Sequence, residues 1–165
     1  MANKRVRTLL LTGLLMVGLV GGAIPAAATN IGNEGCTPGY WKNHTENWQE
    51  YSPTTTLGSV FTLPAYLVAL EDDTFLEALS YSGGPTIVDK AKLLLHHAVA
   101  AFLNAAHEGV GYPLRRFSDP GMMLATTNSA LASADADTIE DLKDTYDANN
   151  NLGCPLGNEN KVKNK

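Results

Sequence analysis

The sequence predicts an all-α protein with four to five helices around one long central helix, and with its two ends closed by a disulfide. The first observation is a long stretch of helical periodicity that runs from about Thr86 to Glu108. The second is that no segment alternates apolar and polar residues like a convincing strand. The third is a pair of cysteines, Cys36 and Cys154, near opposite ends of the expected domain.

The central helix has the clearest apolar stripe. Its apolar residues recur every three or four positions, which places them on one helix face. They are Ile87, Ala91, Leu94, Leu95, Ala98, Phe102 and Ala105. Thr86 and Asp89 have the spacing that caps the start of such a helix, and Gly109 is expected to end it.

An aromatic segment follows Cys36. Residues 37–39 predict a turn, and a helix is expected to start after it. Helical spacing would then place four ring-bearing residues on one face: Tyr40, His44, Trp48 and Tyr51. Trp41 would lie beside that face. We favour the interpretation that these rings belong to the core, because Trp is usually buried; the alternative is a platform of Trp41 and Trp48 for a sugar or peptide.

Residues typical of helix N-termini predict the remaining helices. Residues 54–63 are ambiguous, because they fit either an extended piece or a turn of helix. Pro64 is expected at the first position of a short helix. Thr74 and Glu77 have the spacing of a capping box, and Asp137 with Glu140 can cap the last helix. Asp119 precedes Pro120, a pair typical of a helix start. The expected ranges are 64–70, 74–81, 119–134 and 137–148.

The first 28 residues have the pattern of a secretory signal peptide. Lys4, Arg5 and Arg7 precede an apolar run from Leu9 to Ile24, and small residues follow it, so cleavage is expected between Ala28 and Thr29. We therefore expect a secreted protein with no transmembrane segment in the mature chain. Residues 29–157 are expected to form a single helical domain, and residues 158–165 a polar, disordered tail.

Charge and cysteine content narrow the function classes. Cleavage would remove three of the 12 basic residues and none of the 17 acidic ones, which leaves a net charge of −8. Such a charge argues against nucleic acid and anionic membranes as partners. Because a secreted chain with two cysteines most simply forms one disulfide, we expect Cys36 and Cys154 to be bonded. A two-cysteine redox or metal site would need the C-x-x-C spacing, which is absent.

The four histidines raise the hypothesis of a metal site. His96 and His107 are separated along the central helix by a rise of about 16 Å, so they cannot share an ion. The expected pairing is His44 with His97, Asn104 or Glu108. The alternative interpretation, which we favour, is that these groups form hydrogen bonds with one another where the aromatic segment docks on the central helix.

No catalytic motif is recognisable in the sequence. A nucleophile elbow of the form G-x-S-x-G is absent, and the paired carboxylates lie at expected helix starts or on solvated faces. We therefore expect no catalytic residues. Asn43-His44-Thr45 has the form of an N-glycosylation sequon, which has a meaning only if the source glycosylates such sites.

Several motifs together resemble a known family. They are Gly35-Cys36-Thr37-Pro38-Gly39-Tyr40-Trp41-Lys42-Asn43-His44, the run from Leu94 to His107, Tyr112-Pro113, the run from Ala130 to Ser133, and the run from Asn150 to Leu156. This set resembles the "CTPGYWKNH" domain of secreted and cell-surface proteins of bacteria and archaea, in its stand-alone form. The resemblance implies a location and an architecture, and it implies no catalytic residues.

These observations lead to one leading hypothesis and two alternatives. The leading hypothesis is a secreted or cell-surface-associated domain with a non-enzymatic role in binding or assembly, which requires no cofactor and has an extracellular protein or polysaccharide as its partner. The first alternative is a metal-binding protein that uses His44 with one of His96, His97 or His107. The second is a carbohydrate-binding or carbohydrate-active protein that uses Trp41 and Trp48. The candidate binding or structural cluster comprises Tyr40, Trp41, His44, Trp48, His97, Asn104 and His107.

Overall fold

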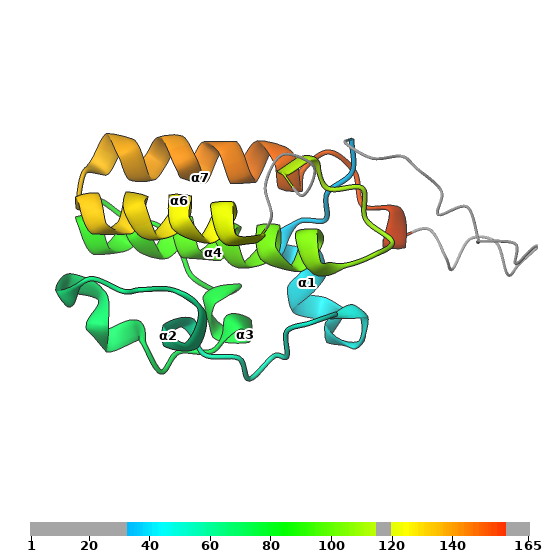
Figure 1. Cartoon of the computed structure of the whole chain (residues 1–165), viewed down its shortest axis with the longest axis horizontal. Coiled ribbons are helices and arrows are strands. Elements are labelled where there is room, and N and C mark those ends of the chain that lie inside the picture. Colours follow the sequence, from blue (N-terminus) through cyan, green and yellow to red (C-terminus); the bar gives the residue numbers. More distant parts are fainter. Residues whose placement is uncertain (1–32, 115–119, 158–165) are drawn as a thin grey trace, which may run out of the picture.

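Helix α4 (Ile87–Ala106) runs through the middle of the protein, and the other elements pack around it (Figure 1). The computed structural model describes residues 33–114 and 120–157. Helices α6 (Pro120–Ser133) and α7 (Ala136–Asn150) contact each other and α4. The short helices of the N-terminal half lie on the opposite side of α4 (Figure 1). The fold is mostly helical, and the described residues form only two isolated β-bridges and no strand.

The start of α4 is the one that the sequence predicts. Thr86 and Asp89 form a reciprocal capping box, in which the Thr86 side chain accepts from the Asp89 backbone N–H at 3.2 Å. The helix ends at Ala106, slightly earlier than the expected Glu108, with His107 as its C-cap. All residues from Ala98 to Ala106 are buried, so this half of α4 is enclosed on every side. Its many alanines allow neighbouring segments to approach closely.

Helix α7 begins two residues before its expected start. The cap is Asp135, whose Oδ1 accepts from the Thr138 backbone N–H at 2.8 Å, and the prediction of Asp137 with Glu140 is therefore wrong. Ala134 has a positive φ of 51°, which turns the chain so that Asp135 reaches this position. Glu140 instead forms an ion pair with Lys90 of α4.

The aromatic segment is not one helix, which corrects the expectation of a shared face. Helix α1 (Pro38–Asn43) ends at His44, where φ is −132° and ψ is 57°, and a short 3-10 helix η1 (Thr45–Asn47) follows. The indole Nε1 of Trp48 donates to the backbone carbonyl of Trp41 at 2.9 Å. A continuing helix would have given that carbonyl to the N–H four residues later. The Trp41 ring is fully buried in the core.

The remaining N-terminal elements are short. They are α2 (Leu57–Val60), η2 (Ala65–Leu70) and α3 (Phe75–Ala78). The predicted capping box of Thr74 and Glu77 is present at the start of α3. Pro64 is the N-cap of a 3-10 helix rather than the first residue of an α-helix.

Aromatic rings attach this N-terminal layer to α4. Phe61 lies edge-on to Phe102 of α4, with ring centroids 5.2 Å apart, and also packs against Phe75 at 6.0 Å. Both contacts are buried, so each ring adds apolar area and a favourable aromatic geometry. The α2 to α3 layer is thereby part of one core with the long helix.

Several sequence-based predictions fall on residues without a structural description here. The expected signal peptide, Asp119 and the polar tail lie outside the described residues. Among the helices of residues 33–114 and 120–157, none has the length and apolarity of a membrane span.

Candidate functional site

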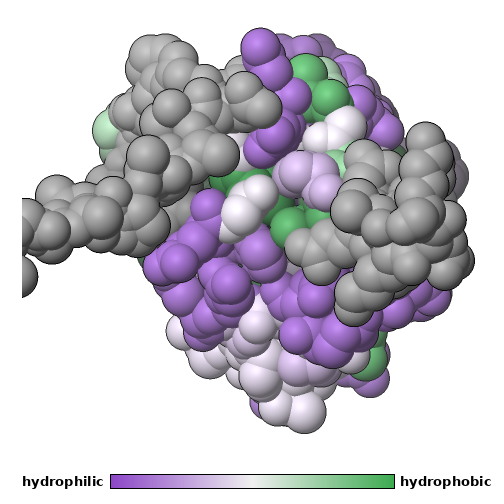
Figure 2. Space-filling view, turned by 90° about the vertical axis from the view of Figure 1, so that its right-hand side faces the viewer, coloured by the Kyte–Doolittle hydropathy of each residue, from purple (hydrophilic) through white to green (hydrophobic). Residues whose placement is uncertain are grey.

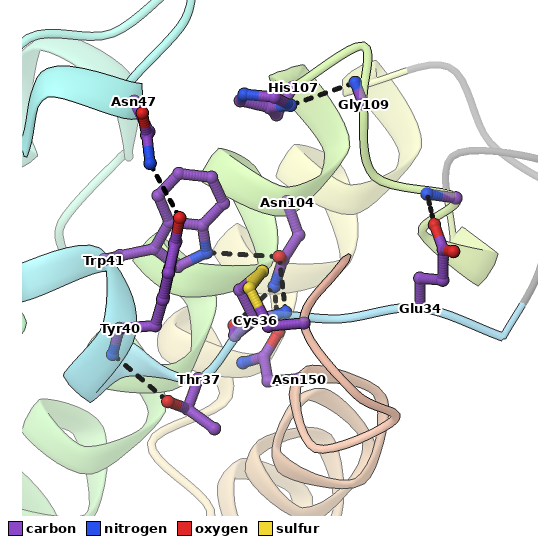
Figure 3. The surroundings of a disulfide bond; sticks show 12 residues. Glu34, Cys36, Thr37, Tyr40, Trp41, Asn47, Asn104, His107, Gly109 and Asn150 are labelled. Atoms are coloured by element: carbon purple, nitrogen blue, oxygen red, sulfur yellow. Dashed lines mark hydrogen bonds between the residues drawn. A yellow bond between two sulfur atoms is a disulfide. The ribbon is translucent and has the colours of Figure 1, made fainter. Parts of the chain in front are cut away.

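A fully buried side chain, Asn104 of α4, lies where the N-terminal motif, the disulfide and α7 meet (Figure 3). Its Oδ1 accepts from the Cys36 backbone N–H at 2.7 Å and from the Trp41 indole N–H at 3.1 Å. Its Nδ2 donates to the Cys36 carbonyl at 2.8 Å and to Asn150 Oδ1 at 3.0 Å. A carboxamide has two donor hydrogens and two acceptor lone pairs, so every hydrogen-bonding capacity of Asn104 is used.

The second buried carboxamide, Asn150, extends this network at the end of α7. Its Oδ1 also accepts from the Tyr112 hydroxyl at 2.9 Å, and its Nδ2 donates to the His97 carbonyl at 3.0 Å. Burial raises the pKa of Tyr112, which keeps the phenol protonated and able to donate. The network therefore joins the start of the domain, the long helix, the segment after it and the last helix.

The disulfide lies beside this network, since Cys36 belongs to both (Figure 3). Cys36 and Cys154 are bonded across a sequence separation of 118, as the sequence predicts. An antiparallel bridge between Gly35 and Gly153 flanks the bond, with the Gly35 N–H donating to the Gly153 carbonyl at 3.1 Å. A Cβ at Gly35 would lie 2.0 Å from the Asn149 carbonyl oxygen, so the close approach of this segment to the end of α7 requires glycine.

The aromatic residues divide into a core part and a surface part. Trp41 has no exposed area, which excludes it from a sugar platform. Trp48 is half-buried. Tyr40 stacks on His44 with centroids 4.4 Å apart, and its hydroxyl accepts from Asn47 Nδ2 at 2.7 Å. The predicted pair of Trp41 and Trp48 therefore does not form a shared surface.

The histidines are distributed over the protein rather than gathered. His44 Nδ1 lies 3.0 Å from Glu46 Oε1, so its described partner is not His97, Asn104 or Glu108. The His107 ring packs 5.9 Å from Trp41, and its Nδ1 accepts from the Gly109 N–H at 3.0 Å.

Glu108, another predicted partner of His44, has a different described contact: its backbone N–H donates to the Gln49 side chain. Within the described ranges, no three His, Cys, Asp or Glu side chains converge as a metal site would require.

His96 and His97 are neighbours on α4 that face different elements: His96 Nδ1 lies 3.3 Å from the Ala78 carbonyl of α3, whereas His97 faces α7. Their rings meet edge to face at 4.9 Å, and His97 Nδ1 lies 3.6 Å from Asp147 Oδ1, too far for a hydrogen bond. That Nδ1 is buried and has no hydrogen-bond partner among the described residues. Burial, together with His96, lowers the pKa of His97 to about 4, although Asp147 acts in the opposite direction. Burial also lowers the pKa of His96.

A groove between α6 and α7 is a feature that sequence reasoning missed. It has a volume of about 210 Å³ and is mainly apolar. Its lining residues are Leu114, Met122, Met123, Thr126, Leu142, Thr145 and Tyr146. The signal in the sequence was α6 itself, which has no charged residue and two adjacent methionines.

Sequence reasoning also missed Asn150 and Tyr112 as members of the network, and Gly35 as the glycine that packs against the end of α7. Asn150 lies in a run of three asparagines that predicts a helix end, and nothing local distinguishes it from its neighbours.

At the disulfide end of the protein, the described surface is mostly hydrophilic, with small hydrophobic areas (Figure 2). The carboxamides of the network do not contribute to this surface, because Asn104 and Asn150 have no exposed area.

Comparison with known proteins found no family model, no curated protein and no solved structure that matches this chain.

Proposed function

We propose that this chain is a secreted or cell-surface-associated helical domain with a non-enzymatic role in binding or assembly. The resemblance to the "CTPGYWKNH" domain and the signal peptide expected from residues 1–28 support that location. The disulfide is consistent with it, because such bonds persist mainly in oxidising compartments. Asn104 and Asn150 support a scaffold role for the motif, since their hydrogen bonds hold the two ends of the domain together.

The groove between α6 and α7 is the observation that carries the binding role. Met122, one of its lining residues, is 61% exposed, so the groove and this side chain together present apolar surface to solvent. Methionine is flexible and polarisable, and surfaces rich in it adapt to the side chains of a partner. The groove therefore suits a single large apolar side chain, such as Leu or Phe.

Acidic residues beside the groove specify the partner further. Asp141 lies one helical turn before Thr145, a lining residue, and Asp144 directly precedes Thr145. Both aspartates are exposed, and Asp144 also forms an ion pair with Lys143, so Asp141 is the stronger candidate to meet a cation. Because the whole chain also has a net charge of −5, a cationic partner would be attracted to it. The partner that fits is a segment of an extracellular protein with an apolar anchor flanked by Lys or Arg.

The expected affinity is low. Burial of one Leu or Phe side chain contributes about 1.5–3 kcal/mol, which by itself corresponds to dissociation constants above about 1 mM. Flanking cations add a salt-dependent contribution. Binding of this strength is useful in an assembly, where many weak contacts act together.

Two short synthetic peptides test this function, each with one central Phe. One has lysines on both sides of the Phe and the other has glutamates. Titration followed by NMR should show binding of the lysine peptide at the groove, weakened by added salt, and no binding of the glutamate peptide. Equal binding of both peptides would refute a cationic partner, and shifts of a sugar titrated in parallel would favour a polysaccharide instead.

A matched pair of variants locates the contact. Met122→Lys removes an exposed apolar side chain at the groove and adds a repelling charge, so binding should be lost. Val68→Lys makes the same kind of change at a residue that is 55% exposed on η2, away from the groove, and binding should persist. Loss of binding in both variants, or in neither, contradicts a contact at the groove.

A further inference from the structure

We propose that Asn43 is the attachment site of an N-linked glycan. The inference rests on the secretion that the proposed function includes. Asn43 is the only asparagine in the chain that has Ser or Thr two residues later, and the residue between, His44, is not proline. That triplet is the acceptor pattern of N-glycosylation. A pattern of three residues recurs by chance, so the case depends on where the fold places it.

The fold places Asn43 on the outer side of α1. Trp41 and Pro38 are the buried residues of this helix. Two residues along an α-helix correspond to a rotation of about 200°, so Asn43 points away from Trp41. Asn43 is exposed, as is Lys42 beside it. A glycan at Asn43 would therefore extend into solvent, and none of the buried network around Asn104 would have to move.

The backbone of the triplet lies at a helix end, and His44 and Thr45 are partly exposed. Asn43 is the last residue of α1, and His44 leaves the helix with φ −132° and ψ 57°. Thr45 begins the short η1 helix, so the triplet lies across a break between two elements rather than inside a long helix. Glycan acceptor sites belong on such surface segments.

The hydrogen bond that the Asn43 side chain makes to Gly39 is compatible with modification. Nδ2 donates to the Gly39 carbonyl at 2.8 Å, at an exposed position. Glycosylation replaces one of the two hydrogens on Nδ2, and the other stays available for the Gly39 carbonyl. The cap at the end of α1 can therefore persist in the glycoprotein.

The reaction needs a donor of one chemical class, a saccharide whose anomeric carbon is joined to a lipid-linked phosphate. Asn43 Nδ2 forms a bond to the anomeric carbon, while the bond from that carbon to the phosphate oxygen breaks. The lipid phosphate leaves with the electron pair, and the amide loses one proton. No oxidation or reduction takes place.

The test is intact-mass and tandem mass spectrometry of the full chain, produced in its own host and collected outside the cell. The expected mass exceeds the mass of the disulfide-bonded polypeptide by at least one sugar residue, located at Asn43. Asn43→Gln and Thr45→Ala should lose this addition completely. Thr45→Ser preserves the acceptor pattern and should keep it, which separates loss of the pattern from a general effect of substitution at this position.

The outcomes distinguish this inference from the proposed function. An extracellular chain with an unmodified Asn43 overturns the glycosylation site and leaves the binding role standing. A chain retained in the cytoplasm contradicts both. A sugar that persists in Thr45→Ala would show that attachment does not depend on the triplet, and would likewise overturn the inference.

Discussion

Asn104 and Asn150 lie 46 residues apart in the sequence, and their carboxamides are hydrogen-bonded at 3.0 Å in the interior of the protein. Each of them also contacts a different part of the chain: Asn104 the backbone of Cys36, and Asn150 the Tyr112 hydroxyl. The pair is therefore the point at which both ends of the domain are joined to the long helix. Buried networks of this kind are stabilising only when all their members are satisfied.

Replacement of Asn104 should strongly destabilise the fold. Asn104→Ala leaves the Cys36 N–H and the Trp41 indole N–H without their acceptor, and each unsatisfied buried group costs about 1–3 kcal/mol. We expect a loss of about 3 kcal/mol or more in the free energy of unfolding, measured by urea denaturation. Asn151→Ala removes two hydrogen bonds to Asp147 at an exposed position, where water can replace them, and should cost no more than about 1 kcal/mol. An equal effect of the two substitutions would contradict the role of the network.

Gly35 and Gly39 give a second matched comparison. A Cβ at Gly35 would meet the Asn149 carbonyl oxygen at 2.0 Å, whereas a Cβ at Gly39 has its nearest neighbour at 3.8 Å. Gly35→Ala should lower the free energy of unfolding by about 1–3 kcal/mol, the usual cost of overpacking. Gly39→Ala should be neutral or slightly stabilising, because Gly39 is exposed in a helix. Thermal melts of both variants measure this difference in stability.

Reduction of the disulfide should lower the stability considerably. In the chain-entropy model, a bond that closes a loop of this length contributes about 4–5 kcal/mol. The measurement is urea denaturation with and without a reductant. The double variant Cys36→Ala with Cys154→Ala controls for chemical effects of the reductant, since its denaturation curve should not respond. An unchanged midpoint for the wild-type protein after complete reduction would refute this prediction.

The two tryptophans should respond differently to a fluorescence quencher. Trp41 is fully buried and Trp48 is half-buried. In Trp48→Phe, the remaining emission from Trp41 should resist acrylamide, whereas the emission from Trp48 in Trp41→Phe should be quenched readily. Trp41→Ala should cost about 3–5 kcal/mol of stability, as for other buried rings. Ready quenching of Trp41 would show that it lies at a surface.

Stability should fall as the pH drops from about 6.5 toward 4. Burial lowers the pKa of His97 to about 4, against 6.5 for an exposed histidine, so the unfolded chain binds more protons in this range. The contribution of His97 is complete above pH 6.5 and is lost as the pH falls through the folded-state pKa. His96 acts in the same direction, since burial also lowers its pKa.

A histidine variant checks the origin of that dependence. The groups that face His97 are His96 on its own helix and Asp147, Lys143 and Asp144 on α7. His97→Gln should flatten the profile of unfolding free energy between pH 6.5 and 4. A slope that persists in His97→Gln would assign the effect to another group.

Local signals in the sequence determined much of the helical framework. The Thr74 and Thr86 caps, the long amphipathic helix and the pairing of the two cysteines were all predictable, because each depends on spacing along the chain or on the count of cysteines. The general fold class followed from the same short-range patterns.

The tertiary structure decided the rest. The aromatic segment breaks at His44, where the Trp41 carbonyl accepts from the His44 N–H and the Trp48 indole, and α7 begins at the Asp135 cap, directly after the turn at Ala134. The bond between Asn104 and Asn150 could not be predicted, since nothing local distinguishes Asn150 from its neighbours in the asparagine run. Hydrogen bonds between distant segments depend on positions in space, and the chain sets those positions only when its helices pack together.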